Sequence, residues 1–265
     1  IAAVFIILYT MLAGLVSVAY TDVANGIIIV VSFIIAIPIF FVKAGGFEGM
    51  AISFAEMNKD SHMNFWGVYS TMDIINFCLP SFLLIMGDAN MYQRFFASKD
   101  AKGAKSATKT LIIAIAIAEL MIIIAAWIAS SMIPDAEVGK YVLIYASHKF
   151  LPPLIGAIMM TTIIGIIIST ADSYLLVPTT TLMRDIYLNY FNKNANQKKI
   201  VFLSRVLVII LGIIAYIVSL GFAKSSGFFE RALYAYTIYG AAITPSLVAA
   251  LFWKGATKEG AIASI

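Results

Sequence analysis

The sequence predicts an all-α integral membrane protein, and three observations support this prediction. First, 62% of its 265 residues are hydrophobic and 12% are charged, whereas a soluble domain is nearer half apolar and a quarter charged. Second, the mean hydropathy is +0.95. Third, the apolar residues form long runs and not the short alternating segments of a membrane β-barrel. Such runs fold as helices in lipid, because each backbone polar group then pairs within its own segment.

Seven apolar runs have the length of a membrane-spanning helix, which needs ~20 residues. Charged or polar segments separate them, and the connection between the second and third runs is long enough to hold a short helix. In chain order, the predicted spans are Ile1–Tyr20, Val23–Val42, a run that begins near Ile74, Leu111–Ile133, Leu151–Met183, Ile200–Phe222 and Ala232–Trp253.

The third run has an unusual interior. The letters GDAN, Gly87–Asn90, interrupt it before MYQRFF follows. A discontinuous helix exposes backbone groups that can bind a solute, but the helix could equally end here at the membrane surface, with Asp88 in water. In the other runs, Pro178 and the pair Gly240 and Pro245 mark plausible flex points.

The basic residues predict the orientation. Twelve of the eighteen lysines and arginines fall on one side if the spans alternate, and the positive-inside rule assigns that side to the cytoplasm. Asp22 separates the first two runs on the same side. From the residues alone, its more economical interpretation is an interfacial cap at the start of the second helix.

The fifth run carries an unusual set of hydroxyls in the stretch GIIISTADSYLLVPTTT, residues 165–181. At ~100° per residue, Ile166, Ser169, Thr170 and Ser173 share one arc, and Asp172 lies ~60° beyond its edge. Oxygen ligands at membrane depth suit a small hard cation such as sodium. A single hydroxyl more often bonds to its own helix or joins two helices. The adjacent Ser-Thr pair with an intramembrane acid favours the ion site.

Other functional classes find little support. The chain has one cysteine and two histidines, so a zinc site is not expected. It has no complete phosphate loop and no nucleophile motif, which indicates a protein that is not an enzyme. The net charge of +4 is explained by cytoplasmic loops, and nucleic acid is not an expected partner.

Four stretches together resemble the sodium:solute symporter family, which includes sodium–glucose, sodium–proline and sodium–sialic acid transporters. They cover nearly the whole chain in order and spacing. They are AGLVSVAYTDVANGIII (Ala13–Ile29), GDANMYQRFFASKDAKGAKSA (Gly87–Ala107), STADSYLLVPTTTLMRDIY (Ser169–Tyr187) and AYTIYGAAITPSLVAALFWKGATKEGA (Ala235–Ala261). The resemblance implies the inverted-repeat, leucine-transporter-like fold. The seven runs would be core helices four to ten of a single transmembrane domain, residues 1–265, truncated at both ends.

The resemblance also implies two ion sites. Ser169 and Thr170 match the paired hydroxyls of the family's common sodium site, and Ile166 would add a backbone carbonyl. The remaining ligands would come from the first core helix, which precedes this chain. Some members hold a second sodium at positions that correspond here to Asp22, Asp172 and Ser173. Asp172 stands where a hydroxyl is usual, so this second site could hold sodium, a proton or only a salt bridge.

For the solute, the resemblance points to the break in the third run. Gly87, Asp88 and Asn90 are the expected solute-binding residues. Asp88 matches the sugar transporters' pattern, but Leu84, Ile85 and Met86 stand where aromatic gate residues are usual. That difference argues against identifying the protein simply as a sugar carrier, and Asp88 could equally pair with a cationic amine on the solute.

We therefore expect a sodium-coupled symporter, with Na+ as coupling ion, that imports a small polar organic solute across the plasma or inner membrane. Its other expected partner is membrane lipid. Two alternatives stay open: a proton-coupled symporter of the same fold, and a transporter-like sensor domain.

Overall fold

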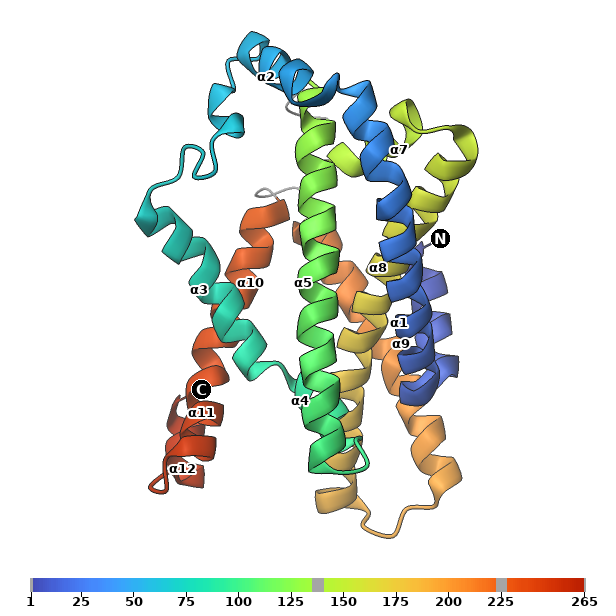
Figure 1. Cartoon of the computed structure of the whole chain (residues 1–265). Coiled ribbons are helices and arrows are strands. Elements are labelled where there is room, and N and C mark those ends of the chain that lie inside the picture. The colour runs from blue at the N-terminus through green and yellow to red at the C-terminus, as the bar shows by residue number, and fades with distance from the viewer. Residues whose placement is uncertain (1, 135–140, 223–227, 265) are drawn as a thin grey trace. The chain divides into compact units, whose positions relative to one another are not determined.

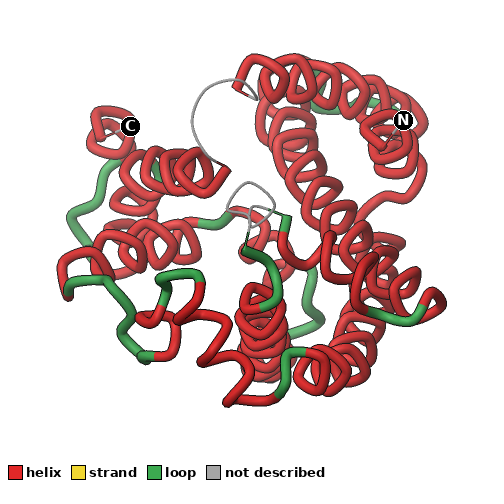
Figure 2. The backbone as a smooth tube through the Cα atoms, turned by 90° about the horizontal axis from the view of Figure 1, so that it is seen from above, coloured by secondary structure: helices red, strands yellow, loops and turns green. Residues whose placement is uncertain are grey.

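Helices are the regular secondary structure of the part that the computed structural model describes, which is residues 2–134, 141–222 and 228–264 (Figure 1). Figure 2 shows helices and loops, and no strand, in these residues. Six of the described helical segments are long and apolar enough to cross a membrane, which confirms the all-α membrane prediction. They are Ser17–Lys43, Thr71–Phe96, Ala101–Ser131, Pro153–Phe191, Gln197–Gly221 and Arg231–Phe252.

The start of the chain differs from the prediction of two spans joined at Asp22. Helix α1 runs over Ala2–Lys43, with its break at Gly14; Ile1 lies outside the described residues. Gly14 has φ 67° and ψ 173°, a backbone conformation essentially restricted to glycine. The apolar helix before the break, Ala3–Leu12, is shorter than a span, so the predicted seven spans become six among the described residues. Asp22 consequently lies inside a helix.

The chain forms two compact units, and the first comprises residues 1–67 and 99–209. Within it, α1, α5 (Ala101–Ser131) and α8 (Pro153–Thr181) run alongside one another (Figure 1). The unit also contains α2 (Gly46–Glu56), η1 (Asp60–Met63), α7 (Val142–Phe150), η2 (Leu182–Phe191) and the first half of α9 (Gln197–Phe222). Helix α2 lies in the long connection between the second and third predicted runs, whose length left room for a short helix without deciding it.

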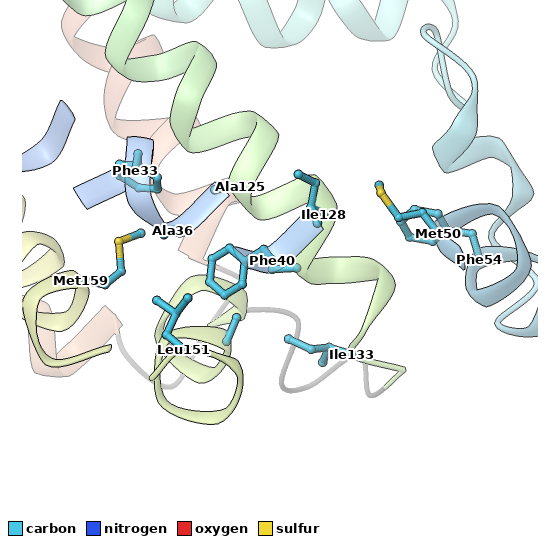
Figure 3. Packing of buried hydrophobic residues seen from close by; sticks show 12 residues of the cluster. Phe33, Ala36, Phe40, Met50, Phe54, Ala125, Ile128, Ile133, Leu151 and Met159 are labelled. Carbon is cyan, nitrogen blue, oxygen red and sulfur yellow. The ribbon is translucent and has the colours of Figure 1, made fainter. Parts of the chain in front are cut away.

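A buried apolar cluster holds this unit together. Figure 3 shows Phe33, Ala36 and Phe40 of α1 together with residues of α5 and of the α7–α8 region. Because lipid tails are as apolar as these side chains, the cluster stabilises the unit mainly through van der Waals packing between helices. The twelve members are Phe33, Ala36, Phe40, Met50, Phe54, Ala125, Ile128, Ala129, Ile133, Ala146, Leu151 and Met159.

Two helices of this unit are longer than the sequence predicted. Helix α5 begins ten residues before Leu111, because Asp100 caps it by accepting a hydrogen bond from the Gly103 amide at 2.6 Å. Helix α8 contains Pro178 as predicted. The chain does not leave the helix at Met183 but continues as the π-helix η2 to Phe191.

The second unit comprises residues 68–98 and 210–265. It contains α3 (Thr71–Gly87), α4 (Ala89–Phe96), α10 (Phe228–Ala242), α11 (Thr244–Phe252) and α12 (Lys258–Ser264). Helix α3 begins with a capping box, in which Ser70 and Asp73 each bind the other's backbone amide. The expected helix over Ala232–Trp253 is divided at Ile243, and Pro245 stands in the first turn of α11, where its missing N–H costs nothing.

Candidate ion and solute sites

A hydrogen bond joins the predicted ion-site residues on α8 to α1. The Ser169 hydroxyl donates a hydrogen bond to Oδ1 of Asp22. Both residues are partly buried. The two belonged to separate predicted ion sites, and the structure joins them.

The other two residues of the predicted sodium site are bonded to each other. The Thr170 hydroxyl, which is exposed, donates to the carbonyl of Ile166 at 2.9 Å. This contact is the intrahelical bond that the simpler interpretation of a membrane hydroxyl predicts. It leaves the hydroxyl oxygen its lone pairs and the carbonyl a second one. Both oxygens can therefore still coordinate a cation.

Asp172 and Ser173 lie one helical turn after Ser169. Their side chains are buried, with exposed fractions of 1% and 8%. The carboxylate is therefore directed into the protein and away from lipid, as intramembrane acids with a function usually are.

A line of polar contacts continues from Asp22 and Ser169 along α1 and α8. The Asn25 amide donates to the carbonyl of Gly165 at 3.4 Å. Farther along, the hydroxyls of Ser32 and Thr162 form a buried hydrogen bond of 2.7 Å. We call these three contacts the polar seam.

Of the α1 residues in the polar seam, Asp22 was predicted from the sequence as an ion-site residue, but Asn25 and Ser32 were not. Asp22, Asn25 and Ser32 fall within an arc of ~80° on a helix, which is a recognisable signal. That signal depends on Asp22 lying inside the helix, and the predicted junction placed it outside.

The predicted solute-binding residues lie in the second unit, where α3 ends and α4 begins. Asp88 has an extended backbone, with φ −66° and ψ 108°, and divides the two helices. This confirms the predicted helix break. Asp88 also caps α4, because its Oδ1 accepts from the Asn90 amide at 2.9 Å. Gly87 is buried, while Asp88 and Asn90 are partly buried.

Two side chains from α10 and α11 bind the backbone on either side of this break. The Ala89 amide, at the start of α4, donates to the Tyr239 hydroxyl at 3.2 Å. The Thr244 hydroxyl donates to the carbonyl of Leu83 on α3 at 2.7 Å. Both contacts join residues at least 150 positions apart in sequence, so no local pattern could have predicted them.

Comparison with known proteins identifies the family. The model of the sodium:solute symporter family matches residues 1–265. The chain is 26% identical over 271 residues to the osmoregulated proline transporter OpuE of Bacillus subtilis, covering 98% of the chain and 53% of that protein. It is 28% identical to the high-affinity proline transporter PutP of Bacillus subtilis, covering 98% and 55%. It is 25% identical to the sodium/proline symporter of Staphylococcus aureus, covering 99% and 52%.

The chain therefore spans about half the length of the curated relatives that it matches. The family match and the six candidate spans together indicate a multi-pass protein of the cell membrane. With the family's model matching from the first residue to the last, this chain belongs to the sodium:solute symporter family.

Proposed function

We propose that this chain is part of a sodium-coupled symporter that imports a small polar solute with a cationic amine, and that proline is the first solute to test. The observation that carries the proposal is the group of oxygens on α8 and α1. Ser169, Thr170 and Ile166 supply hydroxyl and carbonyl oxygens, and Asp22 supplies a negative charge bonded to Ser169.

The chemistry of these oxygens supports sodium. Hard cations prefer oxygen ligands, and a carboxylate next to neutral oxygens offsets the positive charge in a region of low dielectric constant. One cation that moves through ~100 mV supplies ~2.3 kcal/mol. A bound sodium whose site favours one conformation ties this free energy to the uphill movement of the solute.

The solute class rests on Asp88 and on the relatives. A carboxylate at a helix break can pair with the amine of an amino acid, and the matched proteins named above are proline transporters or symporters. The aliphatic residues Leu84, Ile85 and Met86 before the break offer no aromatic ring on which a sugar would stack.

A proton-coupled symporter is the second candidate. Two carboxyl groups, those of Asp22 and Asp172, lie at or near the same part of α8. In that mechanism one of them would carry the coupling proton in place of sodium.

Uptake by the full-length protein in proteoliposomes tests both mechanisms. We expect uptake of radiolabelled proline under an inward sodium gradient, and little uptake when choline replaces sodium. A pH gradient imposed without sodium should not drive it. Uptake that follows the pH gradient and ignores sodium would replace the proposal with its rival, and a panel of amino acids, carboxylates and sugars would correct the solute.

A further inference from the structure

The break at Asp88 leaves backbone groups without partners in their own helix, and two tyrosines bind such groups. Tyr239 of α10 accepts from the Ala89 amide at 3.2 Å, and Tyr92 of α4 donates to the Met86 carbonyl at 3.0 Å. A helix end leaves its first amides and last carbonyls without partners inside the helix. In a membrane these groups have no bulk water to bind, so the protein must supply the partners itself.

Side chains on both sides of the division at Ile243 bind the backbone around Asp88. The Leu83 carbonyl that Thr244 binds lies one turn before the end of α3 and is not one of its last four. Tyr239 lies four residues before the division at Ile243, and Thr244 lies directly after it. Tyr239 accepts from Ala89 on the α4 side of the first break, and Thr244 donates to Leu83 on the α3 side. Thus α4, after Asp88, contacts α10, and α3, before Asp88, contacts α11.

Where α3 packs against α10 and α11, the backbones are so close that Gly87 and Gly240 have no room for a side chain. A Cβ on Gly87 would lie 2.3 Å from the Thr244 hydroxyl oxygen, and a Cβ on Gly240 would lie 2.8 Å from Cβ of Leu83. Thr244 has an exposed fraction of 2%. The Thr244 side chain therefore occupies a defined position against the residues that precede Asp88.

We propose that Tyr239 and Thr244 are positioning residues, which fix the break at Gly87–Asn90 in its solute-binding geometry through its backbone. This inference rests on the proposed function, because it assumes that the solute binds at this break. The two hydroxyls act on backbone groups and not on the solute. They also join the α3–α4 break to the residues on either side of the division at Ile243.

Transport kinetics of the full-length protein test the hydroxyls. Thr244→Val and Tyr239→Phe keep the shape of each side chain and remove one hydrogen bond, so each should raise the KM for proline by about three- to tenfold. Half-maximal sodium at saturating proline should stay within about twofold of wild type, and Thr244→Ser should restore the KM, because it keeps the hydroxyl.

Thr237→Val is the matched control. Thr237 lies on α10, and its exposed hydroxyl donates to Leu233 of the same helix at 2.8 Å. The same substitution there should leave the KM unchanged. A wild-type KM in both Thr244→Val and Tyr239→Phe would overturn the proposal.

A second measurement does not depend on transport. Asn90→Cys, in a background with Cys78 and any other cysteine replaced by serine, reports the geometry of the break through its rate of alkylation by N-ethylmaleimide. Thr244→Val should change this rate several-fold and Thr237→Val should not. If the protein carries no solute but the rate changes, the positioning role stands and only the proposed function fails. If neither rate nor KM changes, the positioning role is wrong.

Discussion

Gly87→Ala should destabilise the protein through a clash with one identified atom. The new Cβ would lie 2.3 Å from the Thr244 hydroxyl oxygen and 3.3 Å from its Cβ. The first distance is about 1 Å shorter than an ordinary contact, and overpacking of this kind typically costs about 1–3 kcal/mol. The hydroxyl cannot simply turn away, because it is buried and donates to Leu83.

The same distances predict that a second substitution, Thr244→Ala, relieves the clash caused by Gly87→Ala. Thr244→Ala removes the clashing oxygen and leaves a tight but tolerable contact with its Cβ at 3.3 Å. Alone, it forfeits one hydrogen bond, for a loss of about 1 kcal/mol. With independent costs of about 2 and 1 kcal/mol the double variant would lose about 3 kcal/mol, whereas relief of the clash predicts a loss near 1 kcal/mol.

A double-mutant cycle measures this coupling. The assay is thermal unfolding of the purified full-length protein in detergent, with wild type, both single variants and the double variant measured together. The expected order of midpoints is Gly87→Ala lowest and the double variant above it. If the stability lost by the double variant equals the sum of the two single losses, Gly87 and Thr244 do not touch. The described packing of α3 against α11 would then be wrong.

The remaining predictions concern the two candidate sites and the break in α1. Asp88→Asn keeps a good N-cap but removes the charge, so it should abolish proline uptake with little loss of stability. Asp88→Ala should abolish uptake and also lower the free energy of unfolding by about 1 kcal/mol. Equal stability of the two variants in thermal unfolding would exclude the capping role. Ser169→Ala and Thr170→Ala should raise half-maximal sodium, measured by uptake, while Thr161→Ala, which removes a similarly exposed hydroxyl bonded to its own helix, should not. Gly14→Ala should cost about 1–3 kcal/mol, because φ 67° with ψ 173° is strained for alanine although open space surrounds the new Cβ; an unchanged unfolding midpoint would contradict the break at this residue.

The sequence predicted the features that depend on local chemistry. The apolar runs indicated membrane helices. The letters GDAN marked the position of Asp88 but fitted a break and a helix end equally well, and the family resemblance favoured the break. Pro245 similarly marked the neighbourhood of the division at Ile243. These residues act through their own backbone or charge, so a short window of sequence contains the whole signal.

Features that depend on a distant partner or a single dihedral angle were not predictable. Asp22 looked like a helix boundary because it is a charged residue between two apolar runs, whereas the chain breaks at Gly14 and gives Asp22 a partner on α8. Nothing near Tyr239 or Thr244 indicates that they bind the backbone of residues 83 and 89. The ligand roles of Ser169 and Thr170 stay a prediction, since their hydrogen bonds suit both a structural and an ion-binding function.

The polar seam also constrains how the chain enters the membrane during synthesis. Asp22 and Ser169 are separated by 147 residues, and a ribosome that adds about 5–20 residues per second needs about 7–30 s to cover that distance. For that interval the newly made α1 carries a carboxylate without its serine. The contact between Asp22 and Ser169 can form only after α8 is made, so correct pairing of the two spans is a late event in the protein's biogenesis.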